Sequence, residues 1–393
     1  MIKINSVDYN KCTRCLVCKL SCPKQAITFN SQYHNFMYPT IDSNKCVDCG
    51  LCYNICHLNA SKTVNCYEQK CFSFWKENTD SLFSTSGGAF FSIAKAFLKS
   101  GGIVFASSWN TDLSLSMKQI RSENELILSL KSKYIESDIS GALPQIKECL
   151  YKNNQVLICA CPCQIAAIKQ YVGNKLQSNL FCIDLVCHGV SCNKSFLDYL
   201  SFIRDKIGFV KSIDFRSKKN GWKNKKGTFV EIVGEKKTIV EKASHNYFMK
   251  LFYSGISYRE SCYRCNYSTH NRVGDITLGD FFEIDSVINN PIASKNGISL
   301  VLVNTKKGDL LLKSLEGESN HLEKQNIRIP FENNESLSRP YPKPKNVDIF
   351  YGLCDSRGFA YACKKCLKTP LKHKLAVLIG IDRIKKIKKL IKR

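Results

Sequence analysis

Eight cysteines near the start of the chain lie in two runs whose spacing suits iron–sulfur chemistry. The first run is Cys12-x2-Cys15-x2-Cys18-x3-Cys22-Pro23 and the second is Cys46-x2-Cys49-x2-Cys52-x3-Cys56. At this spacing three thiolates bind three corners of a [4Fe-4S] cluster, while the fourth reaches the other cluster. We therefore pair Cys12, Cys15 and Cys18 with Cys56, and Cys46, Cys49 and Cys52 with Cys22. A zinc site needs only four ligands and would leave half of these thiols unused.

The two cysteine runs belong to an internal repeat. Cys12 corresponds to Cys46 and Cys22 to Cys56, with the same offset of 34 residues. This duplication indicates a bacterial-type ferredoxin domain with two clusters, which we place at residues 1–65. Residues 34–42, between the runs, are expected to form a short strand and a turn. The second run has His57 where a proline normally follows, a change that could alter cluster solvation without removing a ligand.

Length and composition restrict the class of protein. The chain has 393 residues, of which 44% are hydrophobic, so we expect two or three globular domains. The 22 cysteines would also fit a secreted disulfide scaffold, but residues 1–6 contain no apolar signal core. Reduced thiols in a cytosol fit better. No apolar run approaches the roughly 18 residues that cross a bilayer, so we expect a cytoplasmic protein, or one that lies peripherally on the inner face of the membrane.

The formal net charge of +25 admits three kinds of partner: nucleic acid, an anionic membrane surface, or an acidic electron donor such as a ferredoxin or a partner redox subunit. A lysine-rich composition that only keeps the protein soluble is the alternative. Nucleic acid is not expected, because the aromatic residues are not interleaved with the basic runs. Residues 371–393 contain nine Lys or Arg against one Asp and predict a basic amphipathic helix, which either contacts anionic lipid or packs on the body.

The elements after the ferredoxin region predict a mixed α/β and α+β architecture. We expect a linker over 66–83, a main domain over 84–345 and a C-terminal segment over 346–393. A helix over 89–98, strands over 103–106, 156–160 and 181–186, and a helix over 164–171 indicate an α/β layer. Strands over 212–216, 228–233 and 299–304 indicate an α+β lobe. The C-terminal segment holds Cys354, Cys363 and Cys366, to which Cys66, Cys71 or a histidine could add a fourth ligand, but we expect no metal there.

A third set of cysteines lies where strands of the main domain are expected to end. Cys163 follows Pro162, Cys187 precedes His188, and Cys262-x2-Cys265 lies further on. Ligands commonly gather at one edge of an α/β sheet, and four thiols suffice for another [4Fe-4S] cluster. Buried free cysteines that act as small hydrophobic residues are the alternative.

Several ordered stretches resemble the coenzyme F420 hydrogenase/dehydrogenase beta subunit family. They are Ser86-Gly87-Gly88, residues 132–135, 162–165 and 184–189, Phe215-Arg216 with Gly221-Trp222, and residues 272–281. The resemblance implies an iron–sulfur flavoprotein that binds FAD and holds a third cluster, with Cys163, Cys187, Cys262 and Cys265 as its ligands. Cys159-Ala160-Cys161 stands where the family usually has Ser-Gly-Thr, so Cys161 could compete with Cys163 as a ligand.

Candidate flavin and proton-transfer residues lie within these stretches. Ser86, Gly87 and Gly88 could receive a diphosphate at the start of a helix, or simply cap that helix. Lys133, Arg216 and Lys218 are candidate charge partners of the flavin, although a solvated lysine is the commoner case. Asp275 and Asp280 could bind the ribityl chain or cap a turn. His188 is the candidate catalytic residue, and it could instead donate a hydrogen bond to a cluster sulfur.

These features together predict an oxidoreductase that depends on FAD and iron–sulfur clusters. Electrons from a donor protein would pass through the [4Fe-4S] clusters to FAD and on to an organic substrate, by analogy one of bacterial polysaccharide biosynthesis. The alternative is an electron-transfer beta subunit of a larger hydrogenase or dehydrogenase complex, with no substrate of its own.

Overall fold

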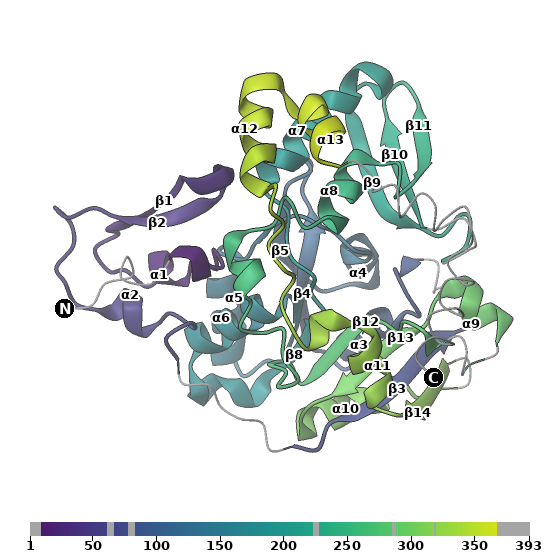
Figure 1. Ribbon diagram of the computed structural model, residues 1–393. Helices are drawn as coiled ribbons and strands as arrows, with labels where there is room; N and C mark the ends of the chain where they lie inside the picture. The colour runs from purple at the N-terminus through teal and green to yellow at the C-terminus, as the bar shows by residue number, and fades with distance from the viewer. Residues whose placement is uncertain are drawn as a thin grey trace, which may run out of the picture. The chain divides into compact units, whose positions relative to one another are not determined.

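The computed structural model describes residues 9–60, 67–77, 83–222, 228–284, 288, 290–317 and 320–367 (Figure 1). The chain divides into two compact units, Met1–Lys343 and Pro344–Arg393. No helix within the described ranges is both long and apolar enough to cross a membrane. The basic helix predicted over 371–393 lies outside the described residues.

The N-terminal region repeats one local structure around each cysteine run. Its elements are η2 (Tyr9–Lys11), α1 (Val17–Leu20), β1 (Ile27–Ser31), η3 (Tyr33–Asn35), β2 (Met37–Ile41) and α2 (Leu51–Asn54). Strands β1 and β2 form an antiparallel hairpin in which Ile27 lies opposite Ile41. Both short helices follow a residue in the left-handed region, Leu16 with a φ of 63° and Gly50 with a φ of 74°. These two residues are 34 positions apart, so the sequence repeat is also a repeat of backbone conformation.

A nine-stranded mixed sheet forms the main domain. Its strand order is β14-β3-β13-β12-β8-β7-β4-β5-β6. The bounds are β3 (Lys70–Lys76), β4 (Ile103–Trp109), β5 (Leu115–Ile120), β6 (Ser137–Asp138), β7 (Val156–Ala160), β8 (Leu180–Leu185), β12 (Ile276–Asp280), β13 (Ser299–Val303) and β14 (Asn320–Gln325). Strands β12, β8, β7 and β4 run parallel at its centre. All residues of β7 and β13 are buried, as expected for strands covered on both faces.

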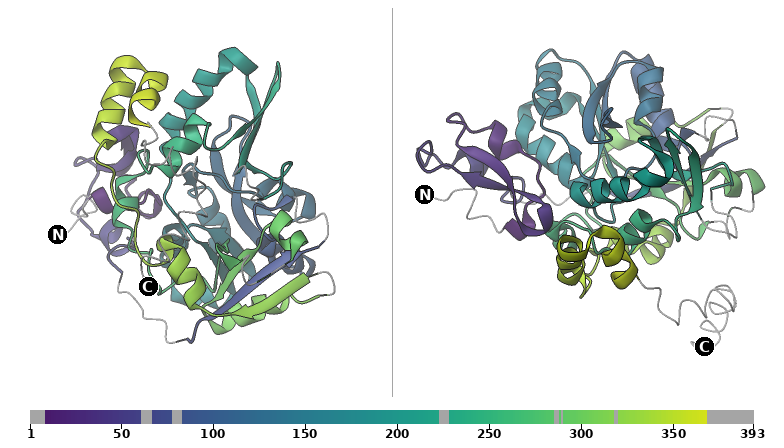
Figure 2. Two further views of the ribbon diagram at one scale, coloured as in Figure 1. Left: turned by 45° about the vertical axis from the view of Figure 1, so that its right-hand side comes forward. Right: turned by 90° about the horizontal axis from the view of Figure 1, so that it is seen from above.

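Helices cover both faces of the sheet (Figure 2). Val104 of β4 and Leu157 of β7 pack in a core with α3 (Ala89–Lys99). The next residue of each strand, Phe105 and Ile158, packs in a second core with α5 (Ala142–Tyr151) and α6 (Pro162–Val172). This alternation follows from the two-residue period of a strand. The predicted helices over 89–98 and 164–171 and the strands over 103–106, 156–160 and 181–186 are therefore confirmed to within a few residues.

The remaining elements form smaller groups. A three-stranded antiparallel sheet has the order β11 (Thr238–Lys242), β10 (Phe229–Gly234), β9 (Val210–Ser217), which confirms the strands expected over 212–216 and 228–233. The other elements of the first unit are α4 (Glu123–Ser129), η5 (Asn174–Asn179), α7 (Asn193–Ile207), α8 (Tyr247–Tyr253), η6 (Glu260–Arg264), α9 (Pro291–Asn296), α10 (Lys306–Lys313), α11 (Arg328–Asn333) and η8 (Glu335–Leu337). The second unit contains α12 (Val347–Arg357) and α13 (Phe359–Cys366).

The segment expected to be a linker over 66–83 contributes a strand to the main sheet. β3 pairs with β13 on one side and β14 on the other, both antiparallel. Phe74 and Trp75 are almost fully buried. The expectation rested on the polar, Ser-rich composition of the segment. It failed because a short strand needs only a few apolar residues when its neighbours come from distant parts of the chain.

Candidate iron–sulfur centres

The eight N-terminal cysteines line two separate cavities, four cysteines each. A cavity of about 200 Å³ is lined by Cys12, Cys15, Cys18 and Cys56, together with neighbours that include Tyr38 and His57. Another cavity is lined by Cys22, Cys46, Cys49 and Cys52. We call these groups the inner and the outer set. Each set offers four thiols, the donor number and type that a [4Fe-4S] cluster takes, and each contains one cysteine from the opposite run.

The inner set is the more buried of the two. Cys18 and Cys56 are buried, whereas Cys49 of the outer set is exposed. Burial raises the pKa of Cys15 to about 12, and the neighbouring thiols of Cys12 and Cys56 contribute to this rise. The cause is that a thiolate loses its hydration in such a site. Bound iron would reverse this effect, because its positive charge stabilises the thiolate.

A third group of thiols gathers at the carboxyl ends of β7 and β8. Cys161 and Cys163 stand at the start of α6, and Cys187 follows β8 by two residues. Burial raises the pKa of Cys163, and the thiols of Cys265, Cys187 and Cys262 raise it further. The structure thus brings the four predicted ligands together, although they are spread over 103 residues of the chain.

Cys161 is a fifth thiol in this group. A hydrogen bond between Cys161 and Cys187 raises the pKa of Cys161 and lowers that of Cys187. Cys161 is also the residue before α6, and its backbone N–H donates to Gln164 Oε1 at 3.4 Å. The group therefore contains one thiol more than a single [4Fe-4S] cluster takes.

Among the described residues, no three His, Cys, Asp or Glu side chains lie close enough to hold a single metal ion. This applies equally to the inner and outer sets. The four ligands of a [4Fe-4S] cluster bind four different irons, so they stand further apart than the ligands of one ion.

The Ser86-Gly87-Gly88 stretch is held by contacts with the sheet. The Ser86 hydroxyl donates to Ile298 O at 2.7 Å. A Cβ on Gly87 would lie 2.0 Å from Phe74 O, and Gly88 precedes α3 with a φ of 95°. Both glycines are thus required by the chain's own packing. Their presence alone does not indicate a bound diphosphate.

The other flavin candidates separate into two groups. Lys218 Nζ donates to Ser86 O at 2.7 Å, and burial lowers its pKa to about 7. Arg216 pairs with Asp280 at 2.9 Å. Asp280 and Arg216 both act electrostatically on Lys218, so these candidates lie together. Among the described residues, Lys133 makes no contact with this group.

Lys133 instead closes the end of α4. Its Nζ donates to the carbonyls of Ser129, Leu130 and Lys131, at 2.6, 2.8 and 3.1 Å. Burial lowers its pKa to about 7. A lysine whose ammonium group is bound by the last carbonyls of a helix caps that helix at its C-terminus. Within the described part of the chain, the structure gives it no contact with the other flavin candidates.

His188 and Asp275 also have partners within the protein. His188 Nδ1 hydrogen-bonds the Tyr258 hydroxyl, and burial lowers the pKa of His188. Asp275 accepts from the Cys182 N–H at 2.8 Å and from the Thr305 hydroxyl at 2.7 Å. Asp275 therefore ties β8 to the segment after β13, which is a structural role.

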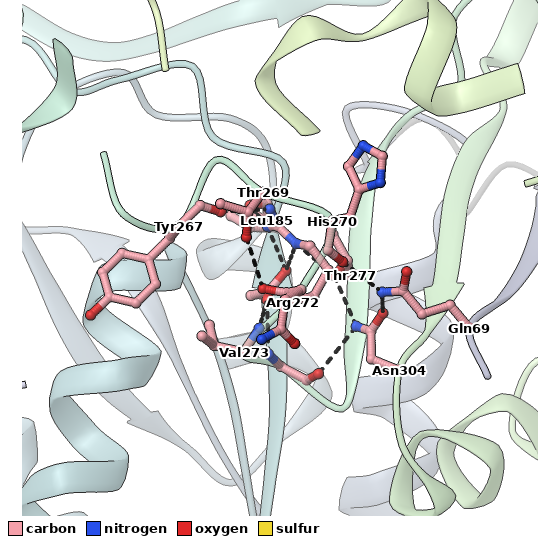
Figure 3. A network of polar contacts seen from close by, with 12 residues as sticks. Gln69, Leu185, Tyr267, Thr269, His270, Arg272, Val273, Thr277 and Asn304 are labelled. Atoms are coloured by element: carbon pink, nitrogen blue, oxygen red, sulfur yellow. Dashed lines mark hydrogen bonds and ion pairs between the residues drawn. The ribbon is translucent and has the colours of Figure 1, made fainter. Parts of the chain in front are cut away.

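Sequence reasoning missed a buried ion pair that organises the third thiol group. Arg272 donates to Asp184 Oδ1 from Nη2 at 2.9 Å, and the two side chains are 1% and 0% exposed. Arg272 also donates to the carbonyls of Tyr267 and Leu185, at 2.9 and 3.2 Å (Figure 3). These contacts connect the chain after Cys265 with the strand that leads to Cys187. Both charged residues occur in the stretches noted above, but nothing in the sequence indicates that they form a pair.

Comparisons with known proteins find two matching regions in the chain. Residues 11–60 match the 4Fe-4S dicluster domain, and residues 153–328 match the family described as the C terminus of the coenzyme F420 hydrogenase/dehydrogenase beta subunit. A chain from a xenon-derivatised structure of the F420-reducing [NiFe] hydrogenase complex of Methanosarcina barkeri is similar at 14% identity and a TM-score of 0.43, over 75% of this chain and 90% of that chain. No curated protein matches. The chain is therefore an iron–sulfur electron-transfer protein in which a region similar to the 4Fe-4S dicluster domain precedes a region similar to the C terminus of the coenzyme F420 hydrogenase/dehydrogenase beta subunit.

Proposed function

We propose that electrons enter at the outer set, pass to the inner set and then reach a third [4Fe-4S] cluster held by Cys163, Cys187, Cys262 and Cys265. The observation that carries this order is the contact of the inner set with the main domain: His57, the residue after Cys56, hydrogen-bonds Tyr267, two residues after Cys265. The Cys15 thiol of the inner set also acts electrostatically on Cys163. The outer set has the exposed cysteine.

The surroundings of the outer set suit an acidic donor protein. Val47 and Leu51 on the rim of its cavity are 58% and 47% exposed, and the rim also carries two exposed charges of opposite sign, Lys24 and Asp48. Exposed apolar side chains can contact a partner, while the net charge of +25 on the whole chain steers an acidic one toward the protein. We therefore place the docking site of the donor, a ferredoxin or a partner redox subunit, over the outer set.

FAD is the electron acceptor that the family resemblance implies. Arg216 would provide positive charge for its phosphates, and Lys218 a hydrogen-bond donor. Two buried polar atoms nearby support a ligand here: Ser84 Oγ, which lies 3.6 Å from the Cβ position of Gly88, and Trp222 Nε1 have no hydrogen-bond partner within the described part of the chain. Unpaired buried polar atoms are uncommon. When bound, FAD would convert one-electron deliveries into two-electron chemistry.

The final acceptor distinguishes two functions. One is an electron-transfer subunit that passes electrons to a catalytic partner and has no substrate of its own. The other is a reductase that acts on an organic substrate, with His188 as the proton donor. We favour the electron-transfer subunit, because the matched family is defined by a beta subunit and because His188 is already bonded to Tyr258.

Metal and flavin analysis of the protein purified without oxygen tests this proposal. About twelve irons with equal sulfide and one FAD per chain would support three clusters and the flavin. About eight irons would exclude the third cluster, and absence of FAD would exclude the flavin step. Reduction by an acidic ferredoxin without turnover of any tested substrate, until a partner subunit is added, would support the electron-transfer subunit.

Single substitutions test the ligands of the third cluster. Cys187→Ala should lose about four irons and leave the N-terminal clusters intact. Cys163→Ala should do the same, whereas Cys161→Ala should retain all of the iron. Cys182→Ala is the matched control, because Cys182 is a buried cysteine of β8 and not a member of the third group. Unchanged iron in Cys187→Ala would contradict the ligand assignment.

A further inference from the structure

His57 connects the inner set with the third thiol group. Its ring is buried, and Nε2 lies 3.0 Å from Thr13 Oγ1 while Nδ1 lies 2.5 Å from the Tyr267 hydroxyl. Thr13 and His57 directly follow Cys12 and Cys56 of the inner set. Tyr267 stands two residues after Cys265. A hydrogen-bonded chain of three side chains therefore joins the two cysteine sites.

Tyr267 is fixed in place from the main-domain side. Its carbonyl oxygen accepts from Arg272 (Figure 3), and Arg272 is itself paired with Asp184. Asp184 also accepts from the Gly274 N–H at 2.8 Å. The Tyr267 ring points away from this group of contacts, so its hydroxyl can reach His57. The position of the phenol is thus set by the same ion pair that supports the strand leading to Cys187.

The Tyr267 ring lies within electrostatic reach of both cysteine sites. Burial raises the pKa of Tyr267, and thiols of the two sites raise it further: Cys163, Cys265, Cys15 and Cys56. The sequence carries a matching signal, because position 57 normally holds a proline, whose side chain could not make either hydrogen bond.

We propose that Thr13, His57 and Tyr267 set the spacing between the inner [4Fe-4S] site and the main-domain [4Fe-4S] site, and thereby the rate at which electrons cross between them. The inference rests on the proposed third cluster. In this step one electron, supplied by the donor protein, leaves the reduced inner site and reduces the main-domain site, and no covalent bond changes. His57 and Tyr267 act as positioning residues.

Other contacts also join the N-terminal region to the main domain. Removal of the Tyr267 hydroxyl should therefore change the distance between the two cysteine sites without separating the two regions. Arg259 donates from Nη1 to Met37 O at 3.3 Å and to Cys12 O at 3.4 Å, and it pairs with the buried Glu136. Arg14 of the N-terminal region pairs with Asp138 at 3.5 Å. These ion pairs and hydrogen bonds do not involve His57 or Tyr267.

The test compares Tyr267→Phe and His57→Pro with Tyr263→Phe in the full chain, purified without oxygen. Tyr263 is the matched control, because it is a buried tyrosine next to Cys262. The Tyr263 hydroxyl donates to Gly255 O at 2.6 Å, a contact that lies entirely within the main domain. After rapid mixing with a reduced acidic ferredoxin, freeze-quench EPR follows the arrival of electrons at each cluster. Electron transfer between two clusters slows as the gap between them widens, so we expect Tyr267→Phe to slow the inner-to-main-domain step several-fold while the first reduction keeps its wild-type rate.

The iron content separates this inference from the proposed function. Slower transfer and a weaker magnetic interaction between the reduced clusters, with iron and the rate of the first reduction unchanged, would support the bridge. His57→Gln should recover part of the rate, because glutamine can both donate and accept a hydrogen bond. A wild-type transfer rate in Tyr267→Phe with all iron present, or equal slowing in Tyr263→Phe, would refute the role of the Thr13–His57–Tyr267 chain. Either result would leave the third cluster itself unaffected. About eight irons in the wild-type protein would refute the third cluster and the bridge with it.

Discussion

Replacement of Asp184 by asparagine should destabilise the main domain and release the proposed third cluster. Asp184 is fully buried and accepts four hydrogen bonds from its neighbours: two from Arg272, at 2.9 and 3.3 Å, and one each from the Val273 and Gly274 N–H groups, at 3.1 and 2.8 Å. Asparagine keeps the shape of the side chain but not its charge. The guanidinium of Arg272, which is 1% exposed, would remain buried without a counterion.

The size of the effect follows from these contacts. Removal of one partner of a buried ion pair costs about 3–5 kcal/mol, because the remaining charge is uncompensated. The asparagine amide would also direct an N–H₂ group toward backbone N–H donors, and each acceptor lost there costs about 1–3 kcal/mol. We therefore expect a loss of at least about 3 kcal/mol in the free energy of unfolding of the main domain. The chain after Cys265 and the strand before Cys187 should lose their fixed spacing.

Denaturant unfolding without oxygen, followed by tryptophan fluorescence together with the iron content, measures both effects. Asp184→Asn should unfold at lower denaturant and retain about eight irons, whereas Glu148→Gln, at an exposed pair with Lys152, should unfold at the wild-type denaturant concentration. The double variant Asp184→Leu with Arg272→Met should cost less than the sum of the two single changes, because it leaves no buried charge. Wild-type unfolding and full iron in Asp184→Asn would refute the argument.

Three further predictions concern other parts of the chain. Lys24→Glu should lower the second-order rate constant for reduction by an acidic ferredoxin and make that rate constant less dependent on salt. Lys236→Glu, on the exposed β10–β11 hairpin, should leave both quantities unchanged. Equal effects of the two variants would exclude the docking site over the outer set. Burial lowers the pKa of Lys218 to about 7, so the unfolded chain binds more protons between pH 7 and 10, and this contribution to stability rises with pH. In Lys218→Met the free energy of unfolding should lack this increase, which in the wild type amounts to up to about 1.4 kcal/mol per pH unit. The same pH dependence of the free energy of unfolding in both proteins would contradict the prediction. Vesicles with anionic lipid should bind the full chain more tightly than a chain without residues 371–393, and equal binding would exclude a membrane role for that segment.

The features predicted from sequence are those that local spacing determines. The pairing of Cys22 with the second run and Cys56 with the first follows from the x2, x2, x3 pattern, and the structure lines two cavities accordingly. The cysteines at 163 and 187 are predicted to meet because each follows a buried strand. Parallel neighbours such as β7 and β8 end at the same edge of the sheet.

The features that could not be predicted depend on contacts between distant residues. Tyr267 and His57 are separated by 210 positions, and Arg272 and Asp184 by 88. Such pairs leave no periodic pattern, so each residue by itself fits an ordinary surface or core position. Lys133 shows the opposite case: its charge suggested a ligand contact, but its partners are backbone carbonyls within four residues, which no side-chain motif indicates.

The two cysteine runs contribute to the two sets in an order that differs from their order in the chain. The first run supplies three thiols to the inner set, although it is the part of the domain furthest in sequence from Cys163. The second run, closer in sequence to the main domain, supplies three thiols to the outer set. Because Cys56 belongs to the inner set, the residue after it faces the main domain, and His57 is able to contact Tyr267. The histidine at position 57 therefore joins the inner set to the main domain, in addition to any effect on the solvation of the inner site.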